Sequence, residues 1–469
     1  MPNNLLALPA HDGSSLYVPE AAPALGETVS VFIRTPTAAA VRNVHIRTTP
    51  DGEPRFAEAT VDRVGADETW WRVDVEVRNP VTGYRFLLDT GHGPQWLNAA
   101  GVSRRDVPDA TDFRLLSYDP PPGWAADAAV YQIFPDRFAR SAAAAGRPLP
   151  DWAIPCGWDT PVIGRGPETP HQFYGGDLDG VTEHLDHISA LGVNTVYLTP
   201  IFPARSNHRY DASAFDRVDP LLGGDEALAR LTAAAHARGL RVLGDLTTNH
   251  CGDAHPWFEA AQAGGAEREL FYFSGFGEDD YESWQGVKSL PKLNWASPEL
   301  RRRFVDGPDS VTQRWLRPPY GLDGWRVDVA NMTGRRAAQS DTVEVARLLR
   351  RGTTAARGEA LLVAEHAHDA SPDLDRDGWQ ATMNYAGFTR PLWTWLRSEN
   401  LSLPDFLGVP AAYRRGPGPM SWPPCVRSLP SPRGARSATG GPCWARTTPP
   451  GSGRSWPTRP GSRSRSGSW

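Results

Sequence analysis

The 469-residue sequence is poor in cysteine and contains no long uninterrupted apolar run. Its four cysteines form no CxxC pair (Cys156, Cys251, Cys425 and Cys443), so no disulfide framework is indicated and we treat them as incidental. No run of 18 apolar residues occurs, and no basic segment precedes an apolar stretch at the N-terminus. The sequence therefore indicates neither a membrane span nor a secretory signal, and we expect a cytoplasmic protein.

Acidic residues and lysine are absent from residues 411–469, which carry ten arginines. The formal charge of this segment is therefore about +10, and the rest of the chain carries about −15, because the total is −5. Basic tails often contact nucleic acid or membranes. The arginines follow no periodic pattern, however, and we expect neither partner.

What is present is the composition of a globular protein, with 40% apolar and 22% charged residues. Within residues 27–90, the segment WWRVDVEVRN (70–79) alternates valine with charged residues, which is typical of a half-buried strand. These strand signals end at a run of three prolines, residues 120–122. We predict an N-terminal β-sandwich over residues 1–120.

The sequence then changes to short apolar runs separated by helical patterns, most of which end in glycine. Repeated β/α units in this number favour a (β/α)8 TIM barrel, which we predict over residues 121–408. A small subdomain is expected at about 251–300, because that gap is too long for a loop. The six predicted strands lie in AVYQIF (129–134), VNTVYLTPIF (193–202), LRVLGDLTTNH (240–250), GWRVDVA (324–330), LLVAEH (361–366) and ATMNY (381–385).

Polar residues close several of these runs, where a TIM barrel places its active site. Two carboxylates on neighbouring strands, Asp328 and Glu365, suit a nucleophile and a general acid/base for retaining cleavage of a glycosidic bond. Arg326 would keep Asp328 ionised. Taken singly, each residue has a simpler explanation, because a lone Asp is often a helix cap and a lone Arg a salt-bridge partner. Their joint placement on successive strand ends favours an active site.

Several motifs resemble one enzyme family over about residues 20–408. GDLTTNH (244–250), GWRVDVAN (324–331) and LLVAEH (361–366) are similar, in that order, to the first three conserved regions of the α-amylase family of glycoside hydrolases, family 13. Four other motifs resemble its neopullulanase, cyclomaltodextrinase and maltodextrin glucosidase branch. They are VYQIFPDRF (130–138), FYGGDLDG (173–180), SNHRYDASAFDRVDPLLGG (206–224) and SLPKLNW (289–295).

The resemblance implies retaining hydrolysis of α-glucosidic bonds in maltooligosaccharides or related α-glucans. Asp328 matches the nucleophile and Glu365 the acid/base. Met332, next to Asn331, stands where relatives usually have Glu, His or Lys, which leaves the product preference open. The resemblance also implies that the N-terminal β-sandwich is of a carbohydrate-binding kind. Relatives with such an N-terminal module often pair, so a homodimer is an expectation. The predicted substrate-binding residues are Arg326, His250, His208, Tyr210, Asp245, Asn249 and Asn331.

No metal or cofactor is predicted. Calcium-binding relatives carry several Asn and Asp residues after the motif PDRF, whereas this chain reads ARSAAAAGRP there. Asp177 is the one clear candidate ligand, together with the carbonyl of Gly175. Two oxygens are too few for a calcium site.

The resemblance also implies a third acid, an Asp after a His on barrel strand seven. The two His-Asp pairs of the sequence, at 11–12 and 368–369, lie elsewhere. From about residue 409 the chain becomes rich in Arg, Pro, Ser and Gly, and we predict that 409–469 is an aberrant, disordered tail that leaves the barrel truncated after strand six.

A shifted reading frame accounts for this composition. Read from the third base of each codon, Pro442–Thr448 is compatible with LLGSHD, which would supply the missing His-Asp. We hypothesise a frame disruption between about residues 409 and 419, which the nucleotide sequence tests. The alternative function is therefore a catalytically impaired pseudoenzyme or truncated gene product.

Overall fold

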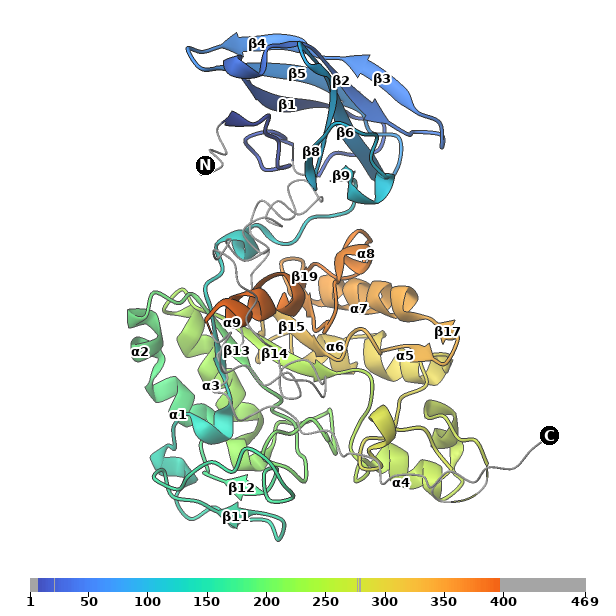
Figure 1. The fold of residues 1–469 in the computed structure, drawn as a ribbon. Helices are drawn as coiled ribbons and strands as arrows, with labels where there is room; N and C mark the ends of the chain where they lie inside the picture. The colour runs from blue at the N-terminus through green and yellow to red at the C-terminus, as the bar shows by residue number, and fades with distance from the viewer. Residues whose placement is uncertain (1–6, 21, 276, 278–279, 397–469) are drawn as a thin grey trace, which may run out of the picture.

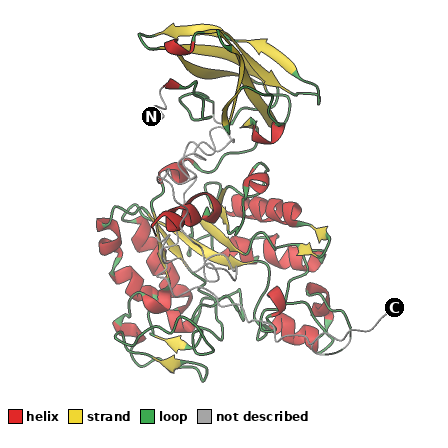
Figure 2. Cartoon of the chain, in the orientation of Figure 1, coloured by secondary structure: helices red, strands yellow, loops and turns green. Residues whose placement is uncertain are grey.

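The computed structural model describes residues 7–20, 22–275, 277 and 280–396. A β-rich N-terminal module is followed by a larger module in which helices surround a central sheet (Figures 1 and 2). The predictions made for residues 409–469 lie outside the described residues.

Two antiparallel sheets form the N-terminal module, one ordered β1-β5-β4 and the other β3-β2-β6-β7-β8, with β9 paired to β6. In β5 the valines are buried and the charged residues between them exposed, as predicted. Val31 and Val73 of the first sheet share a core with Ile46 and Phe86 of the second, so the sheets pack face to face. The strands are β1 (Thr28–Pro36), β2 (Val41–Thr48), β3 (Arg55–Glu58), β4 (Thr60–Val64), β5 (Glu68–Glu76), β6 (Val81–Thr90), β7 (Gly93–Asn98), β8 (Gly101–Ser103) and β9 (Phe113–Leu116).

His11 is buried in this sandwich as a neutral imidazole. Its Nδ1 lies 2.7 Å from the carbonyl oxygen of Phe32, and its Nε2 lies 2.8 Å from the hydroxyl of Tyr84. Because a carbonyl can only accept, Nδ1 carries the proton and Nε2 accepts from Tyr84. Burial lowers the pKa of His11 to about 4.

We expect the N-terminal module to lose stability in mild acid because of His11. Between pH 6.5 and 4 the unfolded chain takes up a proton that folded His11 does not, so the free energy of unfolding falls by about 3 kcal/mol as the pH drops through this window. Urea unfolding from pH 7 to 4 measures this loss. His11→Gln should flatten the dependence, whereas His92→Gln, at an exposed histidine of the same module, should not; equal slopes for both variants would disprove the assignment.

Six parallel strands form the sheet of the second module, in the order β10-β13-β14-β15-β18-β19. Each lies in one of the six predicted apolar runs. Among the described residues β10 and β19 are the two end strands of this sheet; strands seven and eight, and with them the predicted truncation, fall outside the described residues. The strands are β10 (Val130–Ile133), β13 (Thr195–Leu198), β14 (Arg241–Thr247), β15 (Gly324–Asp328), β18 (Leu361–Ala364) and β19 (Ala381–Thr382).

The connecting helices follow from local sequence. In α3, acidic residues occupy the first turn and Leu228 and Leu231 lie on the buried face. Gly239, with φ of +72°, lies just after this helix, and β14 begins two residues later. The helices are α1 (Leu178–Glu183), α2 (Leu185–Ala190), α3 (Gly224–His236), α4 (Pro256–Gln262), α5 (Pro298–Val305), α6 (Val311–Arg314), α7 (Thr342–Ala356), α8 (Ser371–Leu374) and α9 (Arg390–Leu396).

Shorter elements complete the described chain. Two small strand pairs are β11 (Ile154–Pro155) with β12 (Gln172–Phe173), and β16 (Arg335–Arg336) with β17 (Gln339–Ser340). Single turns of 3-10 or π-helix are η2 (Thr37–Ala39), η3 (Asp109–Thr111), η4 (Gly123–Asp127), η5 (Pro135–Arg137), η6 (Ala142–Ala144), η7 (Pro220–Leu222), η8 (Ala266–Leu270), η9 (Trp284–Gly286) and η10 (Tyr385–Thr389).

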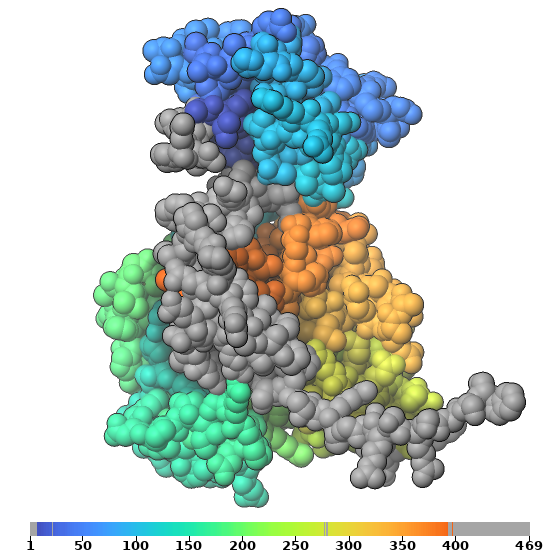
Figure 3. All heavy atoms as spheres, in the orientation of Figure 1, coloured from blue at the N-terminus to red at the C-terminus, as the bar shows by residue number. Residues whose placement is uncertain are grey.

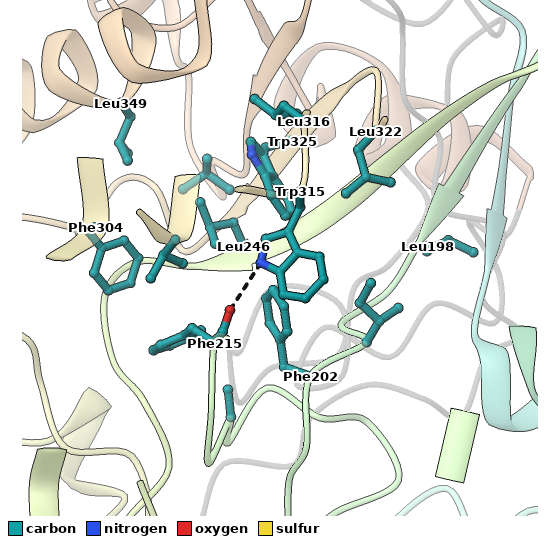
Figure 4. Packing of buried hydrophobic residues seen from close by; sticks show 14 of the residues in the cluster. Leu198, Phe202, Phe215, Leu246, Phe304, Trp315, Leu316, Leu322, Trp325 and Leu349 are labelled. Carbon is teal, nitrogen blue, oxygen red and sulfur yellow. Dashed lines mark hydrogen bonds between the residues drawn. The ribbon is translucent and has the colours of Figure 1, made fainter. Parts of the chain in front are cut away.

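Large aromatic side chains fill the space between the sheet and its helices (Figure 4). Trp315 and Trp325 are fully buried. Their indole N–H groups donate to the carbonyls of Phe215 and Thr312, at 3.1 and 2.9 Å. These bonds satisfy the polar end of each ring, so the core gains apolar area without an unpaired donor.

The two modules meet beside α8. Arg114 of β9 donates to Asp375, just after α8, at 2.6 Å. In the space-filling view the cyan end of the N-terminal module lies against orange residues of the β/α module (Figure 3). Across the described ranges, no helix has the length and apolar character needed to cross a bilayer.

Candidate active site

Arg326 is the centre of a buried cluster of charged residues. Its Nη1 donates to both carboxylate oxygens of Asp245 and to Oδ1 of Asp328, each at 2.9 Å. Its Nη2 forms an ion pair with Oε2 of Glu365 at 2.6 Å. Arg326, Asp245 and Asp328 have no exposed surface, and the Glu365 side chain is 18% exposed. One guanidinium therefore holds three carboxylates together.

Strand register explains this convergence. Asp245 of β14 is the direct partner of Arg326 in β15, and Asp328 lies two residues further on the same face of the strand. Glu365 follows β18, the next strand of the sheet. The four residues therefore share the carboxyl-terminal ends of three adjacent strands, as predicted.

The backbone turns sharply directly after Asp328. Val329 has φ of +46°, a left-handed conformation that a β-branched residue rarely adopts. In this conformation its N–H donates to Oε2 of Glu365 at 3.0 Å. Strained residues of this kind gather at functional sites, and this one connects the two predicted catalytic positions.

The site is buried and contains several acidic groups, so burial and the neighbouring charges together set the pKa values of its residues. Burial raises the pKa of Asp245, and the neighbouring guanidinium only partly opposes this shift. Burial alone would lower the pKa of Arg326, but the carboxylates of Asp245 and Glu365 hold it well above its usual value. Arg326 therefore stays charged at any working pH.

Tyr210 and His208 form one wall of the site. The hydroxyl of Tyr210 donates to Oδ2 of Asp245 at 3.1 Å, and the guanidinium carbon of Arg326 lies 5.7 Å from the centre of the tyrosine ring. His208 stacks on Tyr210 with ring centres 5.7 Å apart, and its side chain is 36% exposed. The two rings therefore extend from the partly exposed side chain of His208 to the buried carboxylate of Asp245.

The chain after β14 supplies the opposite wall. Nε2 of His250 lies 3.9 Å from Oδ2 of Asp328, and the ring of His250 is hydrogen-bonded to the amide of Asn249 at 3.2 Å. The ammonium of Lys292 donates to Oδ1 of Asn249 and to the carbonyl of Met332, the latter at 3.0 Å. Burial lowers the pKa of Lys292 to about 8. Lys292 therefore fixes the side chain that orients His250.

Three further contacts of the site were not predicted from the sequence. The hydroxyl of Tyr197 donates to Asp245, the hydroxyl of Tyr385 donates to Oε1 of Glu365 at 3.3 Å, and Sδ of Met383 lies 3.3 Å from Nε of Arg326. Tyr385 closes the ATMNY motif, so its place directly after a strand was a usable signal. Tyr197 lies inside a strand and carried none.

Asn331 lies in the turn after β15, three residues beyond Asp328, and is half-buried. Its part in substrate binding stays a prediction. The predicted strand-seven Asp belongs to the part of the chain outside the described ranges.

Asp177 does not fit the role of a calcium ligand. Its Oδ1 accepts from the backbone N–H groups of Ser141 and Gly180, at 3.1 and 2.8 Å. Its Oδ2 accepts from the hydroxyl of Ser141 at 2.7 Å and from Arg147 at 2.8 Å. The carboxylate is fully buried, and the guanidinium of Arg147 supplies the positive charge that a cation would otherwise bring.

A parallel β/α sheet with catalytic-type carboxylates at its strand ends defines a barrel-type enzyme domain. Comparison with known proteins matches residues 132–394 to the family described as alpha amylase, catalytic domain. The chain belongs to the alpha-amylase family.

Several curated proteins are similar to this chain. A cyclomaltodextrinase of a Bacillus species is 33% identical over 333 residues, which are 67% of this chain and 55% of that protein. The intracellular maltogenic amylase of Bacillus subtilis strain 168 is 30% identical over 405 residues, 80% of this chain and 63% of that one. Neopullulanase 2 of Thermoactinomyces vulgaris is 35% identical over 352 residues, covering 71% of this chain and 56% of that protein. The chain thus spans between half and two thirds of the length of these relatives.

Solved structures give the same picture. A cyclomaltodextrinase structure superposes with a TM-score of 0.59 at 28% identity, covering 85% of this chain and 67% of that one. The type III pullulan hydrolase from Thermococcus kodakarensis gives a TM-score of 0.57 at 25% identity, covering 82% of this chain and 66% of that one.

Proposed function

We propose that this chain hydrolyses α-glucosidic bonds with retention of configuration, using Asp328 and Glu365. The observation that carries the proposal is the pairing of both carboxylates with one guanidinium, that of Arg326. A retaining enzyme needs its two carboxyl groups about 5 to 5.5 Å apart. Neighbouring positions at the ends of β15 and β18 support this arrangement.

In this mechanism Glu365 protonates the leaving glycosidic oxygen while Asp328 attacks the anomeric carbon, giving a covalent glycosyl-enzyme. Glu365 then takes a proton from water, which attacks the same carbon and releases Asp328. Arg326 keeps Asp328 anionic, and His250 reaches the sugar hydroxyls beside it. The rings of Tyr210 and His208 form an apolar face on which a sugar can stack.

We propose a short or cyclic maltodextrin as substrate. Support comes from the relatives, which are named cyclomaltodextrinase, maltogenic amylase and neopullulanase. One relative is named as intracellular, which supports the expected cytoplasmic location. Homodimer formation stays a prediction.

The experiment is hydrolysis of a cyclomaltodextrin, a linear maltooligosaccharide and pullulan by the purified chain, followed by proton NMR of the products. We expect the α-anomer to appear first, because two displacements restore the original configuration. Initial release of the β-anomer would disprove the retaining assignment.

A frame-restored version of the chain separates the two candidate functions. If only the restored version hydrolyses the substrate, this chain is the catalytically impaired or truncated product. The assignment of Asp328 and Glu365 as the catalytic pair would still stand. Absence of hydrolysis by both versions would overturn the proposed function. The nucleotide sequence tests the frame hypothesis directly, because stop codons in the alternative frame beyond codon 420 would refute it.

We also propose that the fold needs no calcium. Chelation with EDTA should leave the melting temperature and hydrolysis unchanged, because Arg147 already neutralises Asp177. Arg147→Met should lower the free energy of unfolding by about 2 to 3 kcal/mol, since it leaves a buried carboxylate unpaired. Arg351→Met, at an exposed arginine of α7, is the control. A fall in melting temperature with EDTA would refute the proposal.

A further inference from the structure

A cluster of two histidines and one aspartate lies beside the catalytic strand end. His366 directly follows Glu365, His368 comes two residues later, and Asp373 lies in α8. One ligand-type atom from each of the three falls within 4.8 Å of the other two. No step of the proposed hydrolysis uses these side chains.

Two of the three ligand atoms already have a spacing that a metal ion could use. Nε2 of His366 and Oδ2 of Asp373 lie 3.1 Å apart and are hydrogen-bonded to each other in the absence of a metal. Two donors on one tetrahedral zinc ion, at about 2.0 to 2.2 Å from it, lie about 3.4 Å apart. The His366 side chain is fully buried, and the edge of its ring packs on Trp379 with ring centres 6.4 Å apart, so this donor is held in place.

His368 is the adjustable member. It is exposed, and its ring centre lies 5.3 Å from that of His366. A change of rotamer that moves its ligand atom by about 1 to 1.5 Å would bring all three ligand atoms to the spacing that zinc requires. Exposed side chains change rotamer freely, and the solvent side of the cluster leaves room for water as a fourth ligand.

We propose that His366, His368 and Asp373 bind a zinc-class transition-metal ion. Two imidazoles and one carboxylate are the donors that select zinc and its neighbours over calcium or magnesium. Nδ1 of His366 is buried and meets no acceptor within the described chain, so the tautomer that frees Nε2 for the metal is disfavoured. We therefore expect micromolar rather than nanomolar affinity.

Binding would link β18 to α8, next to the contact between Arg114 and Asp375 that joins the two modules. The bound metal would therefore stabilise the segment that follows Glu365 by holding it against α8. A ligand that binds only the folded chain raises its melting temperature. Zinc should therefore stabilise the intact protein, and this readout does not depend on its activity.

The test is titration of the full chain with zinc alone, by calorimetry and by thermal unfolding, with cobalt as a spectroscopic probe. We expect one ion per chain, visible absorption typical of four-coordinate cobalt, and a rise in melting temperature. His368→Ala and Asp373→Asn should each weaken zinc binding at least tenfold and abolish that rise. Equal affinity in both variants and the parent would overturn the proposal.

Two controls separate this site from other histidines and from the catalytic acids. His187→Ala removes an exposed histidine of α2 and should leave zinc binding unchanged. Glu365→Gln should also bind zinc as the parent does. Loss of binding in Glu365→Gln, with retention in His368→Ala, would place the ion at the catalytic carboxylates and refute the assignment. Binding at the proposed site with no hydrolysis would separate this inference from the proposed function.

Discussion

Asp328→Asn is expected to lower turnover of a maltooligosaccharide by at least about 10⁴-fold, the scale of loss seen when a catalytic nucleophile is removed. The amide has the shape of the carboxylate but cannot form the glycosyl-enzyme. Because Arg326 keeps its contacts with Asp245 and Glu365, the fold should be retained. The Michaelis constant should change little, since the interaction lost belongs to the transition state.

The measurement is steady-state hydrolysis of a chromogenic α-glucoside by the parent, the variant and a control. Asp216→Asn removes an exposed carboxylate whose ion-pair partner is the neighbouring Arg217, and it should keep full activity. A second variant, Asp328→Gly, leaves the space of the carboxylate empty for added azide, and a β-glycosyl azide product would identify that position as the nucleophile's. Parent-level turnover in Asp328→Asn would mean that another residue is the nucleophile.

Arg326→Met is expected to lower the free energy of unfolding by about 3 to 5 kcal/mol and to abolish hydrolysis. The change leaves Asp245, Asp328 and Glu365 close together without a cation, and removing one partner of a buried ion pair costs this much. Methionine fills much of the same volume, so the loss measures charge rather than a cavity. Chemical denaturation followed by tryptophan fluorescence measures it.

A second variant separates charge from packing. Arg326→Met combined with Asp245→Asn should recover part of the lost stability, because it removes one unpaired carboxylate; such coupling is typical of residues in one network. Arg326→Lys should lie between the parent and Arg326→Met, since one ammonium cannot reach all three acids. Additive losses in the double variant would contradict the assigned role of Arg326.

The sequence predicted the strand ends better than the contacts between them. Asp328 and Arg326 were predictable as a pair because residues two apart in a strand share a face. Asp245 was predicted only as a substrate-binding residue, whereas the structure makes it a direct partner of Arg326. That contact depends on the register between β14 and β15, which one strand's sequence does not contain.

Local pattern alone therefore determined the β-rich N-terminal module, the six apolar strands and the placement of Asp328 and Glu365 at strand ends, because each depends on residues near one another in the chain. Tertiary structure alone decided that Arg147 forms the ion pair with Asp177, that Lys292 donates a hydrogen bond to Asn249, and that His366 contacts Asp373. These contacts join residues brought together by packing of separate elements, and the distances between side chains in a folded core are set by that packing rather than by sequence spacing.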